Sequence, residues 1–155
     1  LNQVLAPGSL DSEKVRYALK TQMFYSFLDT ACLCQFVWGP SWEMFGPQET
    51  VQMMQDVTGW SDFSLEELLK VGERRLNLMR AFNAREGLTR AQDQLPAKFF
   101  QPLQGEGPTA GVALDPAVIE RAKEEYYTLL GWDPATGQPT PHGLAELGLA
   151  WVNHP

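Results

Sequence analysis

The chain has 155 residues, of which 44% are hydrophobic and 20% charged, as expected for one folded domain and not for a disordered segment. Its 12 Lys and Arg residues are scattered among 19 Asp and Glu residues, and the formal net charge of −7 argues against nucleic acid or an anionic membrane as a partner. We find no apolar stretch near the roughly 18–20 residues that span a bilayer, and no secretory signal.

The first ten residues contain Pro7 and Gly8 and predict a loop. Asp11 or Ser12 is the expected N-cap of a long helix that ends near Ala31. Its core-facing stripe has a spacing of four and comprises Val15, Leu19, Met23 and Phe27, with Ala18 and Phe24 beside them. The next segment, CLCQFVWGP, is apolar as far as Gly39, so we expect buried chain that leads into a turn.

Pro47 suits the first position of a second helix, which we expect to run through Val51, Met53 and Met54 and to stop near Thr58 and Gly59. Its methionines, like Met79 further on, are interpreted as core residues.

A third helix is predicted from a capping box at Ser64 and Glu67 to a C-terminal glycine at Gly87. Its apolar stripe comprises Leu65, Leu68, Leu69, Leu76, Met79 and Phe82. The acidic residues Glu66, Glu67 and Glu73 are interpreted as a solvated face.

Residues 88–114 are rich in Pro and Gly, and a structureless stretch of that length usually packs on something or carries function. Asp115 and Pro116 predict another helix that ends at Gly131, and Thr140 and Pro141 predict a last short one that ends at Gly148. Strand-like alternation is not convincing anywhere. The sequence therefore predicts an all-α, irregular helical domain of four to five helices with a long loop.

Common catalytic motifs are absent: the sequence has no phosphate-binding or dinucleotide-binding glycine loop, no HExxH and no GxSxG. The two cysteines, Cys32 and Cys34, are too close for an easy disulfide, which favours a reduced, cytoplasmic setting. His142 and His154 lie far from them and show no zinc-type spacing. No catalytic residue can be assigned.

The segment from Asp29 to Cys34 combines a carboxylate at a helix end with two thiols, and the residues alone leave two interpretations open. Either both cysteines are inert, buried side chains and Asp29 makes a local cap, or the segment is a binding site. Tyr126, Tyr127 and Trp132 also allow two interpretations, aromatic core or the wall of a substrate channel, and aromatic core is favoured.

The segment LDTACLCQF resembles the second cofactor motif, Asp-x-x-Gly-Leu-Cys, of the tungsten-containing aldehyde:ferredoxin oxidoreductase family. Asp29, Leu33 and Cys34 match the motif, and Cys32 stands where the family usually has Gly. Residues 58–100 are similar to the family's long helix and following loop, and residues 124–149 resemble its C-terminal signature. The likeness extends from about Val15 to Leu149.

The resemblance implies a tungsten (or molybdenum) ion held by two pterins, beside a [4Fe-4S] cluster. Cys34 would be one thiolate ligand of the cluster, and the family's other three lie in a preceding domain. Asp29 would accept hydrogen bonds from a pterin ring, and Leu33 would offer a backbone group to it. Cys32 is a less favoured cluster ligand, and a Cys in place of Gly puts the fine geometry of pterin packing in question.

The implied activity is oxidation of an aldehyde to a carboxylic acid, with electrons passed to ferredoxin. Residues 1–155 would form the C-terminal helical domain, without the N-terminal pterin-binding β domain and the middle helical domain. The chain starts at Leu1 and not at Met, which agrees with that expectation. We expect the isolated chain to be inactive and to hold no cofactor, and its partners to be the remaining domains, ferredoxin and the aldehyde.

Two alternatives remain open on sequence grounds. One is a subunit of the kind found in tungsten-dependent benzoyl-coenzyme A reductases. The other is a stand-alone helical scaffold or interaction module of the same ancestry that has lost the cofactor.

Overall fold

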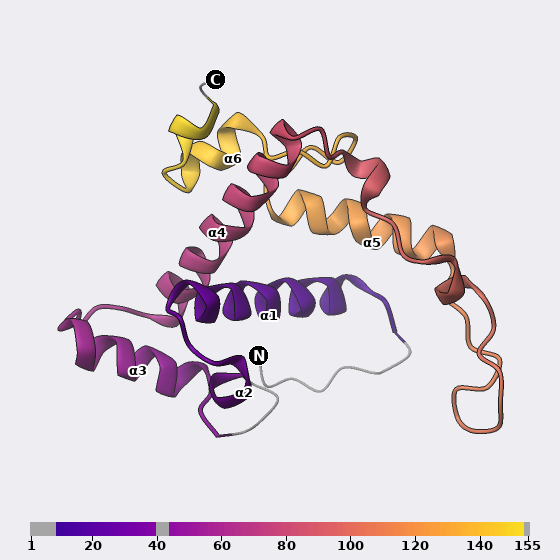
Figure 1. Cartoon of the computed structure of the whole chain (residues 1–155), viewed down its shortest axis with the longest axis horizontal. Coiled ribbons are helices and arrows are strands. Elements are labelled where there is room, and N and C mark those ends of the chain that lie inside the picture. Colours follow the sequence, from indigo (N-terminus) through magenta and orange to yellow (C-terminus); the bar gives the residue numbers. More distant parts are fainter. Residues whose placement is uncertain (1–8, 40–43, 154–155) are drawn as a thin grey trace.

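A computed structural model of the chain describes residues 9–39 and 44–153 (Figure 1). Within these ranges the structure is helical and contains no strand, so the all-α prediction is confirmed. The α-helices are α1 (Ser12–Thr30), α2 (Gln35–Trp38), α3 (Pro47–Thr58), α4 (Leu65–Arg85), α5 (Pro116–Leu129) and α6 (Pro141–Glu146). Three short 3-10 turns complete the described elements: η1 (Arg90–Gln92), η2 (Ala97–Phe100) and η3 (Ala150–Asn153). None of these helices is both long enough and apolar enough for a membrane span.

The helices begin where the capping residues in the sequence predict. Asp11 accepts a hydrogen bond from the Lys14 amide at 2.9 Å, and Ser64 accepts one from the Glu67 amide at 3.2 Å. Thr140 caps α6 in the same way, with its hydroxyl bonded to the Gly143 amide at 3.0 Å. The one α-helix that the sequence did not predict is the single turn α2.

The centre of the molecule is the contact of α1 with α4 and α5, which Figure 1 shows lying beside one another. The α1 stripe is buried as predicted, with Val15, Leu19, Met23 and Phe27 all below 9% exposure. Gly72 of α4 faces the α1 backbone so closely that a Cβ atom there would lie 1.9 Å from the Met23 carbonyl oxygen. Only a residue without a side chain permits this crossing, because a methyl group would force the two helices apart.

The predicted stripe on α4 is only half right. Leu68 is fully buried against α1, but Met79 and Phe82 are 48% and 55% exposed. Both residues lie beyond the crossing with α1, in the C-terminal half of α4. Helical periodicity predicts which residues share a face, but it does not say how far along that face a neighbouring helix extends.

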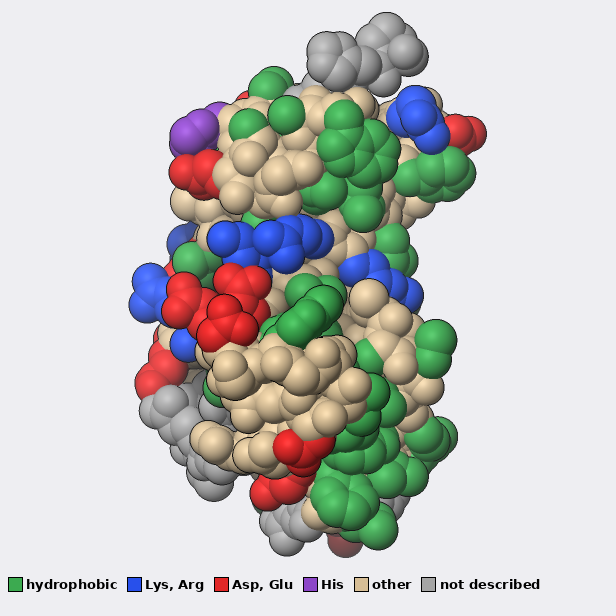
Figure 2. All heavy atoms as spheres, turned by 90° about the vertical axis from the view of Figure 1, so that its left-hand side faces the viewer, with side chains coloured by type: hydrophobic (Ala, Val, Ile, Leu, Met, Phe, Trp, Pro, Cys, Tyr) green, Lys and Arg blue, Asp and Glu red, His purple; other side chains and the backbone are tan. Residues whose placement is uncertain are grey.

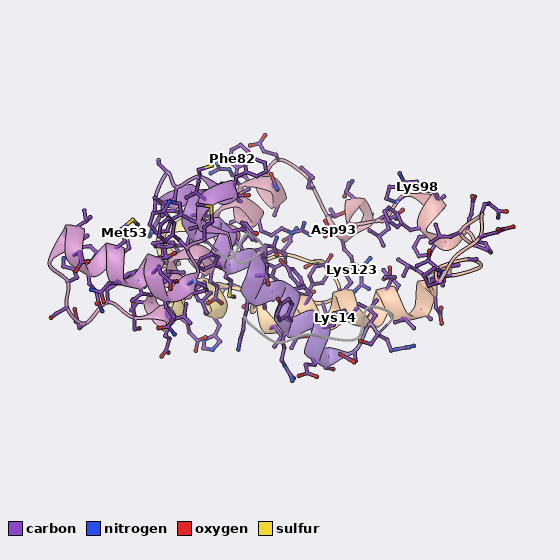
Figure 3. All side chains as sticks on the ribbon, turned by 90° about the horizontal axis from the view of Figure 1, so that it is seen from below. Lys14, Met53, Phe82, Asp93, Lys98 and Lys123 are labelled. Atoms are coloured by element: carbon purple, nitrogen blue, oxygen red, sulfur yellow. The ribbon has the colours of Figure 1, made fainter. Side chains whose placement is uncertain are left out.

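Residues 99–114 form an arm that projects away from the helices (Figure 1). The arm closes on itself through two backbone hydrogen bonds of 2.9 Å, from the Leu103 amide to the Val112 carbonyl and from the Gly111 amide to the Leu103 carbonyl. Every residue from 101 to 113 is exposed. Lys98 lies out toward this arm, well away from Asp93 and Lys123, which face each other (Figure 3). The predicted long loop is therefore present and contains two 3-10 turns.

Candidate functional site

The segment that the sequence singles out lies at the C-terminal end of α1 and leads into α2. The chain leaves α1 through a left-handed turn at Cys32, whose φ of 56° makes it the one non-glycine residue with a positive φ among those described. The Cys32 amide bonds to the Asp29 carbonyl at 3.2 Å, and the Leu33 amide bonds to the Leu28 carbonyl at 2.8 Å. These two bonds form a Schellman motif, whose left-handed position is usually Gly.

This turn brings both thiols to the surface. Cys32 and Cys34 are exposed, free cysteines, so the interpretation of both as inert, buried side chains is wrong. The expected burial of the whole segment is also wrong, since Phe36 is 74% exposed. An apolar run in sequence does not fix burial here, because a turn followed by one helical turn can bury only one side. Leu33 and Trp38 take that side and pack against the core cluster around Phe24 and Leu28.

Cys34 occupies the N-cap position of α2. Its carbonyl accepts hydrogen bonds from the amides of Val37 and Trp38, each at 3.0 Å, while its side chain makes no capping bond. The backbone of Cys34 is therefore fixed and its sulfur is left exposed to the surface.

The Asp29 carboxylate is exposed in the last turn of α1 and is bound from two elements. Its Oδ1 accepts a hydrogen bond from Gln35 Nε2 of α2 at 2.8 Å, and its Oδ2 pairs with Arg75 Nη1 of α4 at 3.1 Å. The same Arg75 nitrogen lies 3.2 Å from the hydroxyl of Ser26, which is 3% exposed. The predicted site residues Asp29 and Cys34 thus lie exposed on one short segment, and Leu33 between them is partly buried against the core.

A complete metal site is not present in the described part of the chain, since no three His, Cys, Asp or Glu side chains gather there. Cys34 can supply one ligand, with Cys32 next to it in the turn. His142 pairs instead with Glu146 of its own helix at 3.4 Å, and His154 lies outside the described residues.

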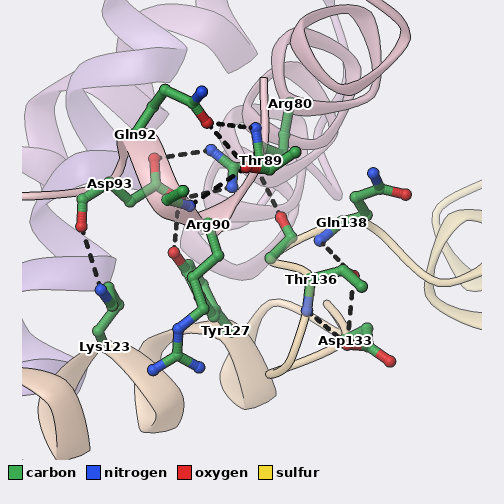
Figure 4. A network of polar contacts seen from close by, with 12 residues as sticks. Arg80, Thr89, Arg90, Gln92, Asp93, Lys123, Tyr127, Asp133, Thr136 and Gln138 are labelled. Carbon is green, nitrogen blue, oxygen red and sulfur yellow. Dashed lines mark hydrogen bonds and ion pairs between the residues drawn. The ribbon is translucent and has the colours of Figure 1, made fainter. Parts of the chain in front are cut away.

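A second polar cluster, which sequence reasoning missed, joins α4 to the loop after it and to α5 (Figure 4). The buried Arg80 donates to both carboxylate oxygens of Asp93, at 2.9 and 2.5 Å, and its Nε donates to the Gly137 carbonyl at 2.6 Å. Tyr127 donates its hydroxyl proton to Asp93 Oδ2 at 2.5 Å, and Lys123 bonds to the Asp93 carbonyl at 3.1 Å. No spacing rule connects these residues, which come together only through the tertiary fold.

Charge in this second cluster is balanced by close contacts. Burial alone would raise the pKa of Asp93, but the hydrogen bonds from Arg80 and Tyr127 outweigh it and the pKa lies below its usual value. Burial, with the neighbouring Asp93 carboxylate, raises the pKa of Tyr127. The cluster is therefore a closed, internally satisfied network, of the kind that fixes a fold.

The aromatic residues near this cluster belong to the core. Tyr127 and Trp132 are buried with Leu19, Met23 and Leu130, and Tyr126 packs against that group. Trp132 donates its ring N–H to Asn77 Oδ1 at 2.8 Å. Burial also raises the pKa of Tyr126 to about 12. The core interpretation of these aromatic residues is confirmed.

Glu73 departs from the solvated face predicted for it. It lines a hollow of about 590 Å³ between α4, the end of α5 and α6, together with Lys70, Glu146 and Gly131. Burial raises the pKa of Glu73, although Lys70 and Arg74 oppose the rise. No sequence signal separates Glu73 from Glu66 and Glu67, because the hollow is formed by residues of the end of α5 and of α6 that lie far away in the sequence.

Figure 2 shows how side chains are distributed on the face formed by the left-hand side of Figure 1. Hydrophobic side chains gather in the upper and lower parts of this face, and a band of Lys and Arg lies between them. Exposed hydrophobic residues of α2, α3 and the segments next to them include Phe36, Phe45, Val57 and Trp60. An exposed accumulation of large hydrophobic side chains is typical of surfaces that contact other protein.

Comparison with known proteins identifies the family of the chain. The family model described as "Aldehyde ferredoxin oxidoreductase, domains 2 & 3" matches residues 2–149. The tungsten-containing aldehyde ferredoxin oxidoreductase of Thermococcus kodakarensis is 35% identical over 149 residues, which cover 93% of this chain and 22% of that protein. The protein of the same name from Pyrococcus furiosus is 33% identical over 146 residues, with the same coverage.

Among solved structures, the active site complex BamBC of benzoyl coenzyme A reductase, in complex with 1,5 dienoyl-CoA, has the same fold, with a TM-score of 0.73. The identity is 21%, and the match covers 98% of this chain and 22% of that one. The chain thus spans about a fifth of the length of the relatives it matches. A family model that covers nearly all of the sequence, together with relatives above 30% identity, shows that the chain belongs to the aldehyde ferredoxin oxidoreductase family.

Proposed function

We propose that this chain is the C-terminal helical domain of a tungsten-pterin, iron–sulfur oxidoreductase that oxidises aldehydes to carboxylic acids and passes the electrons to ferredoxin. In this proposal, Cys34 supplies one thiolate of a [4Fe-4S] cluster, and Asp29 and Leu33 contact a pterin. The metal, the pterins and the cluster supply the redox chemistry, and the chain supplies binding and orientation. The observation that carries the proposal is the exposed Cys34 sulfur on a backbone held by α2.

The donor groups on this segment fit such cofactors. The Cys34 sulfur is exposed and makes no capping bond, as a ligand shared with another polypeptide segment must be. Each Asp29 oxygen has one hydrogen-bonding partner and keeps a further lone pair for a ring N–H donor. The Leu33 amide already bonds to Leu28, so the Leu33 carbonyl is the backbone group that remains for a ligand.

The proposal requires further polypeptide. A [4Fe-4S] cluster takes about four thiolates, and this sequence has two cysteines. The chain also spans 22% of its relatives, so the remaining ligands would come from other domains. We therefore expect the isolated chain to be colourless and inactive. A stoichiometric cluster on the isolated chain would contradict this assignment of ligands.

The decisive experiment replaces each cysteine in the complete protein that carries this chain. Cys34→Ser is expected to strip or destabilise the cluster, measured as iron per protein and by the cluster's electron paramagnetic resonance (EPR) spectrum. Cys32→Gly is the matched control, because Gly suits the left-handed backbone at that position. Normal iron content, cluster spectrum and ferredoxin-linked activity in Cys34→Ser would show that Cys34 is not a ligand.

The two alternatives predict different results in the same preparation. A cofactor-free helical scaffold would contain neither iron nor tungsten in the complete protein. An enzyme of the benzoyl-coenzyme A reductase type would contain both metals but would not oxidise aldehydes. The relatives at 33–35% identity are aldehyde ferredoxin oxidoreductases, whereas the benzoyl coenzyme A reductase match, at 21% identity, supports the fold alone, so aldehyde oxidation is favoured.

A further inference from the structure

The Asp29 carboxylate is bound by two side chains, those of Gln35 and Arg75, neither of which belongs to the cofactor motif. Gln35 Nε2 binds Oδ1 at 2.8 Å and Arg75 Nη1 binds Oδ2 at 3.1 Å. The two partners come from different helices, α2 and α4. Because each oxygen is bound separately, the carboxylate plane cannot rotate without breaking one of the two contacts.

An aspartate at position 29 does not stabilise the C-terminal end of α1. Asp29 lies in the last turn of α1, where the helix dipole disfavours a negative charge. The end of α1 is already closed by the backbone bonds of Cys32 and Leu33 and does not need the Asp29 side chain. With the ion pair partly exposed, at 36% for Arg75 and 41% for Asp29, its contribution to folding is small.

The same contacts link Asp29 to the predicted cluster ligand. Gln35 follows Cys34 directly, so its bond to Asp29 closes a short loop that contains both cysteines. Arg75 attaches that loop to α4 and, through Ser26, to the buried face of α1. The geometry thus fixes the distance between the carboxylate and the Cys34 backbone.

We propose that Arg75 and Gln35 are positioning residues that orient the Asp29 carboxylate toward the N–H donors of a pterin ring. The proposal rests on the function proposed above. Gln35 holds Oδ1 and Arg75 holds Oδ2, which leaves a further lone pair on each oxygen to accept from a ring N–H. Arg75 also neutralises the carboxylate, which lowers the cost of holding a negative charge at the end of α1.

The test measures cofactor content and spectra in the complete protein, and not only activity. Gln35→Ala and Arg75→Gln are each expected to weaken pterin retention about 10-fold, the usual cost of losing a residue that orients a ligand group. Arg75→Lys keeps the charge and is expected to restore part of the retention. The tungsten(V) EPR spectrum is expected to change in Gln35→Ala while iron per protein stays normal.

Matched controls come from similar contacts elsewhere on the surface. Gln52 makes the same type of bond to Asp56 at 2.9 Å within α3, and Arg16 pairs with Glu125 at 3.6 Å. Gln52→Ala and Arg16→Gln are expected to leave pterin content and the tungsten(V) spectrum unchanged.

The outcomes separate this inference from the function on which it rests. If Cys34→Ser loses iron but Gln35→Ala and Arg75→Gln match their controls in pterin content and spectrum, the positioning role is wrong and the function stands. If Cys34→Ser keeps normal iron, cluster spectrum and activity, the assignment of Cys34 in the proposed function fails instead, whatever Gln35→Ala and Arg75→Gln show. Should Arg75→Gln not fold, Gln35→Ala decides alone, since it removes only one exposed contact.

Discussion

Two arginines of α4 each pair with an aspartate, and the two pairs differ in burial, in the number of hydrogen bonds and in what else the carboxylate binds. Arg80 donates two hydrogen bonds to the Asp93 carboxylate, and the Arg80 side chain is 9% exposed. Arg75 reaches Asp29 through one nitrogen, and both partners are more than a third exposed. The Asp93 carboxylate also binds Tyr127, whereas Asp29 keeps free lone pairs. One pair closes the fold, and the other presents a carboxylate at the surface.

The sharpest test of this difference is to remove each arginine. Arg80→Met is expected to lower the free energy of unfolding by about 3 kcal/mol, because it leaves a partly buried carboxylate without its cation. Arg75→Met is expected to lower it by only about 0.5 kcal/mol, the usual contribution of a surface pair. Urea denaturation of both variants measures the two values. Equal losses would show that the pairs play the same role.

The next largest effect concerns pH. Because the pKa of Asp93 lies below its unfolded value of about 3.9, its ionised form stabilises the folded state. That stabilisation is fully present above pH of about 4 and is lost as the pH falls through the folded pKa. Asp93→Asn is therefore expected to flatten the acid part of a plot of stability against pH. If the curve of Asp93→Asn is as steep as that of the wild type, another carboxyl group causes the loss of stability at acid pH.

A smaller effect is expected from the single hydroxyl of Tyr127. Tyr127→Phe keeps the ring in the core but removes one hydrogen bond to the Asp93 carboxylate. The expected loss is about 1.5 kcal/mol, typical for a hydrogen bond to a charged group. Thermal denaturation measures it, and Tyr126→Phe, which loses a hydroxyl bonded to the neutral Gln22, is the matched control with a smaller loss. A larger loss in Tyr126→Phe would contradict the closed-network description.

The smallest expected effect is a gain in stability at Cys32, in contrast to the losses expected above. Cys32→Gly is expected to stabilise the chain by about 0.5 kcal/mol, because relief of the left-handed strain outweighs the added flexibility of the unfolded chain. Chemical denaturation measures the gain, and Cys34→Ala, at an ordinary φ of −71°, is expected to show none. A destabilised Cys32→Gly would mean that the Cys32 side chain makes contacts that offset its backbone strain.

The sequence alone determined most of the helical framework, for a local reason. Asp11, Pro47, Ser64 and Asp115 satisfy free backbone amides or suit the first helical turn, and these effects act within four residues. The left-handed backbone at position 32, where the family usually has Gly, is by contrast a finding of the structure and was not predicted. Asp29, Leu33 and Cys34 could be singled out because one short segment carries all three.

Only the tertiary structure decided what lies beside these elements. Exposure of Cys34, Phe36 and Phe82 depends on where neighbouring helices end, which periodicity does not encode. Arg75 lies 46 residues from Asp29 and Arg80 lies 13 from Asp93, so no local rule pairs them. Burial and charge pairing are properties of the packed chain, because they depend on distances in space that the crossing of α1 and α4 sets.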